Sequence, residues 1–193
     1  MSTGRRRLPP AQRRSEILDA ATSLIAASGF NGISLGRFAE ACGMTKAGLL
    51  HYFASKEDLL IAVLDRRDEL DALAVAPDHT PATDAASSRA LITRLVRRNA
   101  TQPSIVQLYT VLNAEALDPD HPAHRYFAQR LEASRRALEV YAFPWHPESR
   151  RCAVQVLAFL DGLQVNWLRA PSIDLEAEWN AFADRLYADR PPL

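Results

Sequence analysis

Proline and glycine leave long uninterrupted segments over most of the chain. Six of the seven glycines lie within the first 48 residues, and Gly162 is the seventh. Proline is tolerated in the first turn of a helix and breaks a helix interior. Eight of the prolines beyond residue 80 therefore predict boundaries between helices of roughly 15 to 25 residues; they are Pro81, Pro103, Pro119, Pro122, Pro144, Pro147, Pro171 and Pro191.

Apolar residues recur at helical spacing in four segments, and no segment alternates as a strand would. The four stripes are Ile17, Leu18, Ala21, Leu24 and Ile25; Leu59, Leu60, Val63 and Leu64; Phe127, Leu131, Leu138 and Tyr141; and Leu175, Trp179, Phe182 and Leu186. Ser55 opens the second stripe as a helix cap, with Asp58 three residues on. Residues 75–88 are rich in Ala, Pro, Asp, Thr and Ser and predict a linker. These patterns predict an all-α protein.

The composition narrows the class of protein further. The chain has 193 residues, of which 48% are hydrophobic, so it can bury a core within one or two folding units. It lacks an apolar run of 18 residues, and we expect no membrane association. Cys42 and Cys152 lie far apart without a CxxC spacing, which favours a reducing cytoplasm over a disulfide framework.

Charge is divided unevenly along a chain whose formal net charge is zero. Residues 1–56 contain eight basic and three acidic side chains, an excess of five positive charges that the remainder of the chain balances. Such an asymmetry predicts a polyanionic partner for the first part. The alternative is an ordinary solvated surface.

Residues 34–53 have the pattern of a helix-turn-helix. Ser34 and Thr45 are suitable N-caps for two short helices, and Gly43 supplies the turn between them. The apolar residues that would face inward are Leu35, Phe38, Ala39 and Cys42 in the first helix, and Leu49, Tyr52 and Phe53 in the second. The second helix would then present Thr45 to Gly48 to a DNA major groove. Helical hairpins also occur in proteins that never bind DNA.

Phosphate chemistry is consistent with the same hairpin. Helix N-termini at Ser34, Thr45 and Ser55 present unpaired N–H groups and a partial positive charge to anions. The two lysines of the chain, Lys46 and Lys56, each follow one of these caps.

Residues 14–60 resemble the DNA-binding domain of the TetR family of transcriptional regulators. The matching segments are Ile17 to Ala21, Gly29-Phe30, Gly43 to Phe53 and Ser55 to Leu60. The resemblance implies a homodimeric regulator, usually a repressor, of about nine helices. We accordingly expect a flexible basic tail (residues 1–10), a three-helix DNA-binding domain (11–55) and a larger helical domain for effector binding and dimerisation (56–193).

The family pattern also implies which residues lie at or near DNA. They are Ser34, Arg37, Thr45, Lys46, Ala47, Gly48, Leu50, His51, Tyr52 and Lys56. Leu50 stands where the family usually has a tyrosine that reaches a phosphate, so that contact is either replaced or lost. Gly36 removes a side chain from another contact position. Arg5 to Arg7 are either additional phosphate contacts or a tail without function.

A helix over residues 151–168 is apolar nearly all round, so it must be covered on two sides. Together with the last stripe it predicts a two-fold four-helix dimer interface, in agreement with the family resemblance. The expected interface residues are Val154, Leu157, Asp161, Gly162, Val165, Trp179, Phe182 and Leu186. The alternative is a central helix inside a monomer.

A small-molecule pocket is expected in the same domain. A mostly apolar wall with few polar groups is typical of such sites. The candidate lining residues are Leu108, Tyr109, Leu112, Asn113, Phe127, Leu131 and Trp167. For any single one of them, an ordinary core residue is the favoured interpretation.

Metal binding and catalysis are disfavoured. A metal site is suggested by five residues, namely Asp118, Asp120, His121, His124 and His146. However, Asp120 or His121 is better interpreted as the cap of the next helix. The chain contains no GxSxG, HExxH, P-loop or GxGxxG motif, so we expect neither an enzyme nor a cofactor.

The leading hypothesis is a dimeric repressor that binds a palindromic operator in double-stranded DNA and is released by a small molecule. Two alternatives remain. One is a DNA-binding protein without an effector, and the other is a small-molecule binding module whose basic head docks a protein.

Overall fold

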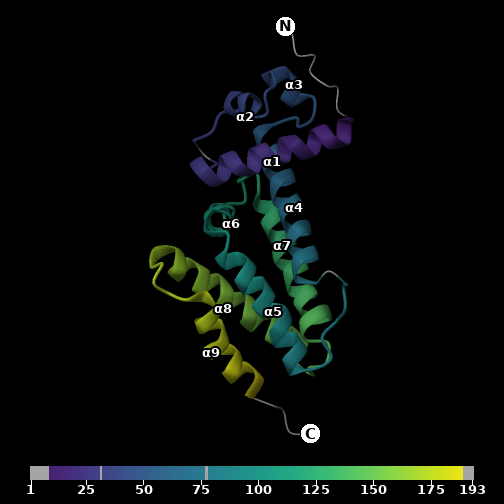
Figure 1. Ribbon diagram of the computed structural model, residues 1–193, viewed down its shortest axis with the longest axis vertical. Coiled ribbons are helices and arrows are strands. Elements are labelled where there is room, and N and C mark those ends of the chain that lie inside the picture. Colours follow the sequence, from purple (N-terminus) through teal and green to yellow (C-terminus); the bar gives the residue numbers. More distant parts are fainter. Residues whose placement is uncertain (1–8, 31, 77, 189–193) are drawn as a thin grey trace. The chain divides into compact units, whose positions relative to one another are not determined.

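The computed structural model describes residues 9–30, 32–76 and 78–188, and within these ranges every regular element is helical (Figure 1). The elements are α1 (Pro10–Ser28), α2 (Leu35–Ala41), α3 (Lys46–Leu50), α4 (Lys56–Val75), α5 (Ala85–Ala100), α6 (Pro103–Glu115), α7 (His124–Ala137), the π-helical turn η1 (Leu138–Ala142), α8 (Ser149–Arg169) and α9 (Leu175–Ala188). The all-α prediction is confirmed. None of the described helices combines the length and apolarity that crossing a bilayer requires.

The chain divides into two compact units, Met1–Arg67 and Asp68–Leu193, and the division falls within the residues of α4. The sequence placed this boundary before Lys56. The difference arises because the first three turns of α4 belong to the first unit. Leu59, Leu60, Val63 and Leu64 are buried there. Arg66 donates to the carbonyl of Ser15 at 2.9 Å and pairs with Asp19 at 2.8 Å, both on α1.

Local signals set the ends of the helices in the first unit. Gly29 adopts a φ of 70° and ends α1, with its N–H donating to the Ile25 carbonyl at 2.8 Å. The Ser34 hydroxyl accepts from the Arg37 N–H, the Thr45 hydroxyl from Gly48, and the Ser55 hydroxyl from Asp58. The three predicted caps are therefore confirmed. The basic tail predicted over residues 1–10 lies outside the described residues up to residue 8, and Pro10 already belongs to α1.

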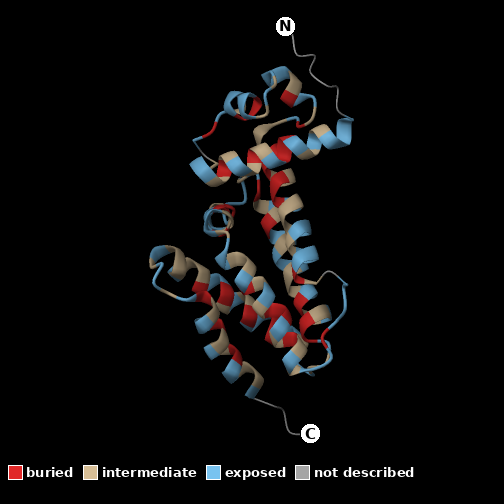
Figure 2. Ribbon diagram, viewed as in Figure 1, coloured by how far each residue is buried: buried red, intermediate tan, exposed pale blue. Residues whose placement is uncertain are grey.

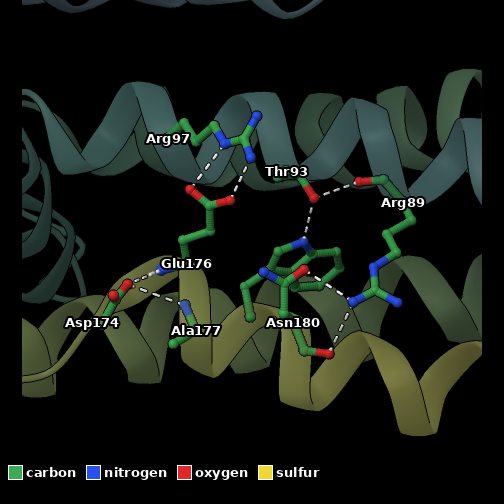
Figure 3. Close-up of polar contacts among 8 residues, drawn as sticks. Arg89, Thr93, Arg97, Asp174, Glu176, Ala177 and Asn180 are labelled. Carbon is green, nitrogen blue, oxygen red and sulfur yellow. Dashed lines mark hydrogen bonds and ion pairs between the residues drawn. The ribbon is translucent and has the colours of Figure 1, made fainter.

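The core of the second unit is formed by α5, η1, α8 and α9, with a contribution from the end of α4. In Figure 2 buried residues alternate with more exposed ones along α5, α8 and α9. Trp179 of α9 is fully buried, and its indole N–H donates to the Thr93 hydroxyl of α5 at 2.8 Å. Figure 3 shows further contacts between α5 and α9, including the two hydrogen bonds from Arg97 to Glu176 and those from Arg89 to Asn180.

Two expectations about the region from α6 to α7 are wrong. Leu131 was expected to line the buried face of its helix, yet its side chain is 60% exposed. Arg130 occupies the inward position instead, because it pairs with Asp68. Neither Asp120 nor His121 is the cap of α7, since that helix begins after Ala123; the His121 ring accepts from the Ala123 N–H at 3.2 Å.

Candidate nucleic-acid interface and second-unit sites

The turn between α2 and α3 is closed by backbone contacts and apolar burial. Gly43 adopts a φ of 61°, and the Met44 N–H donates to the Ala39 carbonyl at 2.9 Å. Phe38 of α2 and Leu49 of α3 are fully buried. Because Leu49 anchors one side of this short helix, the other side faces outward. The two helices form the helix-turn-helix that the sequence predicted.

Most of the residues expected at DNA lie on the outward surface of this unit. Those that are exposed are Ser34, Arg37, Thr45, Lys46, Ala47, Leu50 and His51, whereas Gly48, Tyr52 and Lys56 are half-buried. Leu50, which replaces the usual tyrosine, is 39% exposed. The rings of His51 and Tyr52 meet edge to face, with 5.6 Å between their centroids. The site therefore has polar groups next to the exposed leucine.

Two glycines contribute differently to this surface. A methyl group added at Gly48 would lie 3.3 Å from the Thr45 hydroxyl oxygen, closer than ordinary carbon contacts. The same addition at Gly36 would lie 3.7 Å from the Ser34 hydroxyl oxygen, an ordinary contact. The glycine at 48 therefore leaves room for the cap of α3, while the one at 36 is tolerant of a side chain.

Aromatic rings hold two basic side chains of the first unit. The Lys56 ammonium lies 4.2 Å from the centroid of the Phe30 ring, and the Arg14 guanidinium lies 5.0 Å from that of Phe53. The sequence predicted Phe53 to face inward, but it connected neither ring with a basic side chain. The residues of each pair are far apart in the chain, so helical spacing does not connect them.

The second unit brings together only part of the predicted effector pocket. Leu108, Leu112 and Phe127 are buried, and the Tyr109 ring meets the Phe127 ring edge to face with centroids 6.2 Å apart. Trp167 is partly buried against the core formed by α5, η1, α8 and α9. Asn113 and Leu131 are exposed and do not join this group, because they lie on the outward faces of α6 and α7.

A polar cluster adjoins Tyr109 that sequence reasoning missed. The Asp68 carboxylate accepts from the Tyr126 hydroxyl at 2.7 Å and from Arg130 Nε at 3.0 Å. The Arg130 guanidinium lies over the Tyr109 ring, 4.6 Å from its centroid. Burial raises the pKa of both Tyr109 and Tyr126 well above the ordinary tyrosine value, so both phenols are neutral at physiological pH. Four residues from α4, α6 and α7 thus form one connected group.

The expected dimer residues are divided between core and surface. Val154, Asp161 and Gly162 are exposed, and Leu157, Val165, Phe182 and Leu186 are half-buried. Phe182 stacks on Phe159 with 3.9 Å between ring centroids. Trp179 belongs to the interior of its own unit rather than to a surface, because it inserts between α9 and α5.

The candidate metal ligands are not brought together by the described part of the structure. Across residues 9–30, 32–76 and 78–188, no three His, Cys, Asp or Glu side chains are placed to share a metal ion. A shallow open hollow of about 500 Å³ lies at the start of α8, lined by Pro147, Glu148, Ser149, Arg150, Arg151 and Val154. None of the predicted pocket residues lines it.

Comparison with known proteins gives consistent results. Residues 17–63 match the family described as bacterial regulatory proteins, tetR family. The transcriptional regulator RutR of Escherichia coli K12 is 43% identical over 63 residues, which is 33% of this chain and only 30% of RutR. The transcriptional regulator BetI of Rhizobium meliloti is 30% identical over 182 residues, covering 86% of this chain and 83% of BetI. The FadR regulator of Bacillus subtilis, solved with stearoyl-CoA, superposes with a TM-score of 0.74 at 18% identity, over 92% of this chain and 99% of FadR.

Proposed function

The chain belongs to the TetR family of transcriptional regulators, and on that premise we propose that it is a ligand-responsive repressor that binds a palindromic operator as a homodimer. This family consists of DNA-binding regulators rather than enzymes.

The outward side of α3 is the single observation that supports the DNA contacts best. Its N-terminus is capped by Thr45, it begins with Lys46, and the small residues Ala47 and Gly48 follow before the buried Leu49. Small side chains let a helix approach base edges closely, while the capped N-terminus and the lysine suit phosphate oxygens. We assign base readout to Thr45, Ala47 and Gly48, and phosphate contact to Lys46.

The proposed homodimer uses the exposed side of α8. Val154 is 50% exposed, and Gly162 has no heavy atom within 4 Å of the place where a side chain would begin. A second α8 can therefore approach this surface closely, with half-buried Leu157 and Val165 beside it. A C2 dimer would present two copies of α3 to successive major grooves, about 34 Å apart.

The effector site is proposed around Leu108, Tyr109, Leu112 and Phe127 in the second unit. These residues combine apolar surface with the neutral phenol of Tyr109 and the nearby Arg130. A small molecule with an apolar portion suits such a lining. Because FadR was solved with stearoyl-CoA, acyl-CoA thioesters are the first compounds to test.

DNA binding is tested by measuring the affinity of the full chain for a duplex from the region flanking its own coding sequence, between about 50 and 200 mM salt. We expect affinity to fall steeply with salt, and Lys46→Ala to weaken binding and flatten the slope by about one. The matched control is Arg125→Ala, a basic residue exposed on α7, which should leave both quantities unchanged. A wild-type chain that retains no duplex even at low salt contradicts the proposal.

The effector is tested separately, by thermal unfolding with a panel of acyl-CoA thioesters. A bound ligand raises the unfolding temperature by mass action and should release the duplex. A ligand that binds without releasing DNA, or DNA binding that no compound affects, would favour the effector-independent alternative. Ligand binding without any DNA binding would favour the module that docks a protein.

A further inference from the structure

We infer that Phe30 is a positioning residue for DNA binding, whose ring holds the Lys56 ammonium where a DNA phosphate is contacted. This inference rests on the proposed function, and it assigns a role to a residue outside the DNA-contacting set. The observation behind it is the distance of 4.2 Å between Lys56 Nζ and the Phe30 ring centroid, within the range of a cation–π interaction.

The Phe30 ring is itself held by the fold of the first unit. Gly29 ends α1 in a left-handed conformation that disfavours other residues, and this turn brings Phe30 back toward α2. There the Phe30 ring meets the Phe38 ring with 6.4 Å between centroids, and Phe38 is fully buried. The ring is therefore a braced surface for a cation.

Lys56 is the first residue of α4, directly after the cap Ser55. The unpaired N–H groups at a helix start attract anions. At this helix, however, Glu57 and Asp58 lie in the first turn and oppose an incoming phosphate. A phosphate at this position therefore depends on the charge of Lys56.

The advantage of the ring is that it orders the lysine before DNA arrives. Ordering a long flexible side chain at an interface costs about 0.5–1.5 kcal/mol, which corresponds to roughly two- to tenfold in affinity. Lys46 on α3 makes no aromatic contact within the residues that the structure describes. It is therefore a matched control, a second lysine following a cap but without a ring.

The test is a double-mutant cycle on the full chain, with a fluorescent duplex from its own flanking region at low salt. Phe30→Leu should weaken binding about two- to tenfold in the wild-type background and have almost no effect in Lys56→Ala. In Lys46→Ala, Phe30→Leu should retain its full effect. Phe30→Tyr keeps the ring face and should restore binding. A purely structural role for Phe30 predicts the same loss in all backgrounds, and that result would overturn the inference.

Two further measurements separate the inference from its premise. In the unliganded chain, the NMR signals of the Lys56 ε-methylene protons should be shifted upfield by the ring and should return to ordinary values in Phe30→Leu. Ordinary shifts in the wild type would overturn the inference even if DNA binds.

Pentafluorophenylalanine at position 30 keeps the shape of the ring and removes its negative face. If Phe30→Leu fails to fold, this variant must show the same coupling to Lys56. A wild-type chain that does not bind duplex overturns the proposed function and, with it, the role in DNA binding.

Discussion

The carboxylate of Asp68 on α4 pairs with the guanidinium of Arg130 on α7, with 3.0 Å between Oδ2 and Nε. Asp68 is the first residue of the second unit. Two residues earlier on the same helix, Arg66 is bound to α1 of the first unit. Two residues that lie close together on one continuous helix therefore make their contacts in different units.

Removing the Asp68 carboxylate should destabilise the second unit. Asp68→Ala leaves Arg130 Nε and the Tyr126 hydroxyl without their acceptor. Because these side chains are about one-third exposed, we expect a loss of about 1–2 kcal/mol in the free energy of unfolding. Chemical denaturation measures this. The matched control is Asp184→Ala, which breaks a more exposed pair with Arg89 and should cost at most about 1 kcal/mol. Equal losses would contradict the assignment.

The hydrogen bond between Trp179 and Thr93 should contribute measurably to the attachment of α9. Thr93→Val preserves the shape of the side chain and leaves the indole N–H in the core without its acceptor. An unpaired buried donor costs about 1–3 kcal/mol, measured by chemical denaturation. Thr110→Val is the control, because that hydroxyl donates only to the Val106 carbonyl of its own helix. If both variants unfold at the same denaturant concentration, the bond between helices contributes nothing.

The cap of α5 should make stability depend on pH. The Ser87 N–H donates to the Asp84 carboxylate at 2.8 Å, and this hydrogen bond lowers the pKa of Asp84 below its ordinary value. The native state thus favours the carboxylate, so its contribution is complete above the unfolded-state pKa of about 3.9 and is lost as pH falls through the lower native pKa. Asp84→Ala should lower the unfolding temperature at neutral pH by about 2–4 °C.

Asp84→Asn is the matched variant for this pH dependence. Asparagine is an equally good N-cap and does not titrate, so at neutral pH this variant should resemble the wild type. The wild type should lose stability relative to Asp84→Asn as the pH falls below about 4. Thermal melts across the acidic range measure the difference, and a constant difference would show that the carboxylate is not favoured in the native state.

Adding a methyl group at Gly48 should disturb DNA recognition more than folding. Its carbon would press on the Thr45 hydroxyl at 3.3 Å, while alanine gains up to about 1 kcal/mol of helix propensity over glycine. We expect an unfolding free energy near that of the wild type and a changed preference among duplex sequences. Gly36→Ala meets only an ordinary contact and should change sequence preference less. Selection from a random duplex pool compares the two, and identical preferences would contradict the role of Gly48.

Prediction from the sequence was accurate where a structure depends on residues within one turn of each other. The caps at Ser34, Thr45 and Ser55 each bond to an N–H three residues later, a geometry that the local sequence specifies. It was less accurate for the faces of α7 and α9. Hydrophobicity alone pointed Leu131 inward and Trp179 toward a partner subunit, whereas a charged pair turns Arg130 inward and α5 covers Trp179.

The sequence by itself determined an all-helical chain, its helix-turn-helix and the polar caps that begin those helices, because periodicity and capping are interactions between near neighbours. Only the tertiary structure decided that α4 is shared between two units, that Asp68 meets Arg130, and that Phe30 lies against Lys56. The two contacts join residues that are far apart in the sequence. They depend on how the helices pack, which no local pattern encodes.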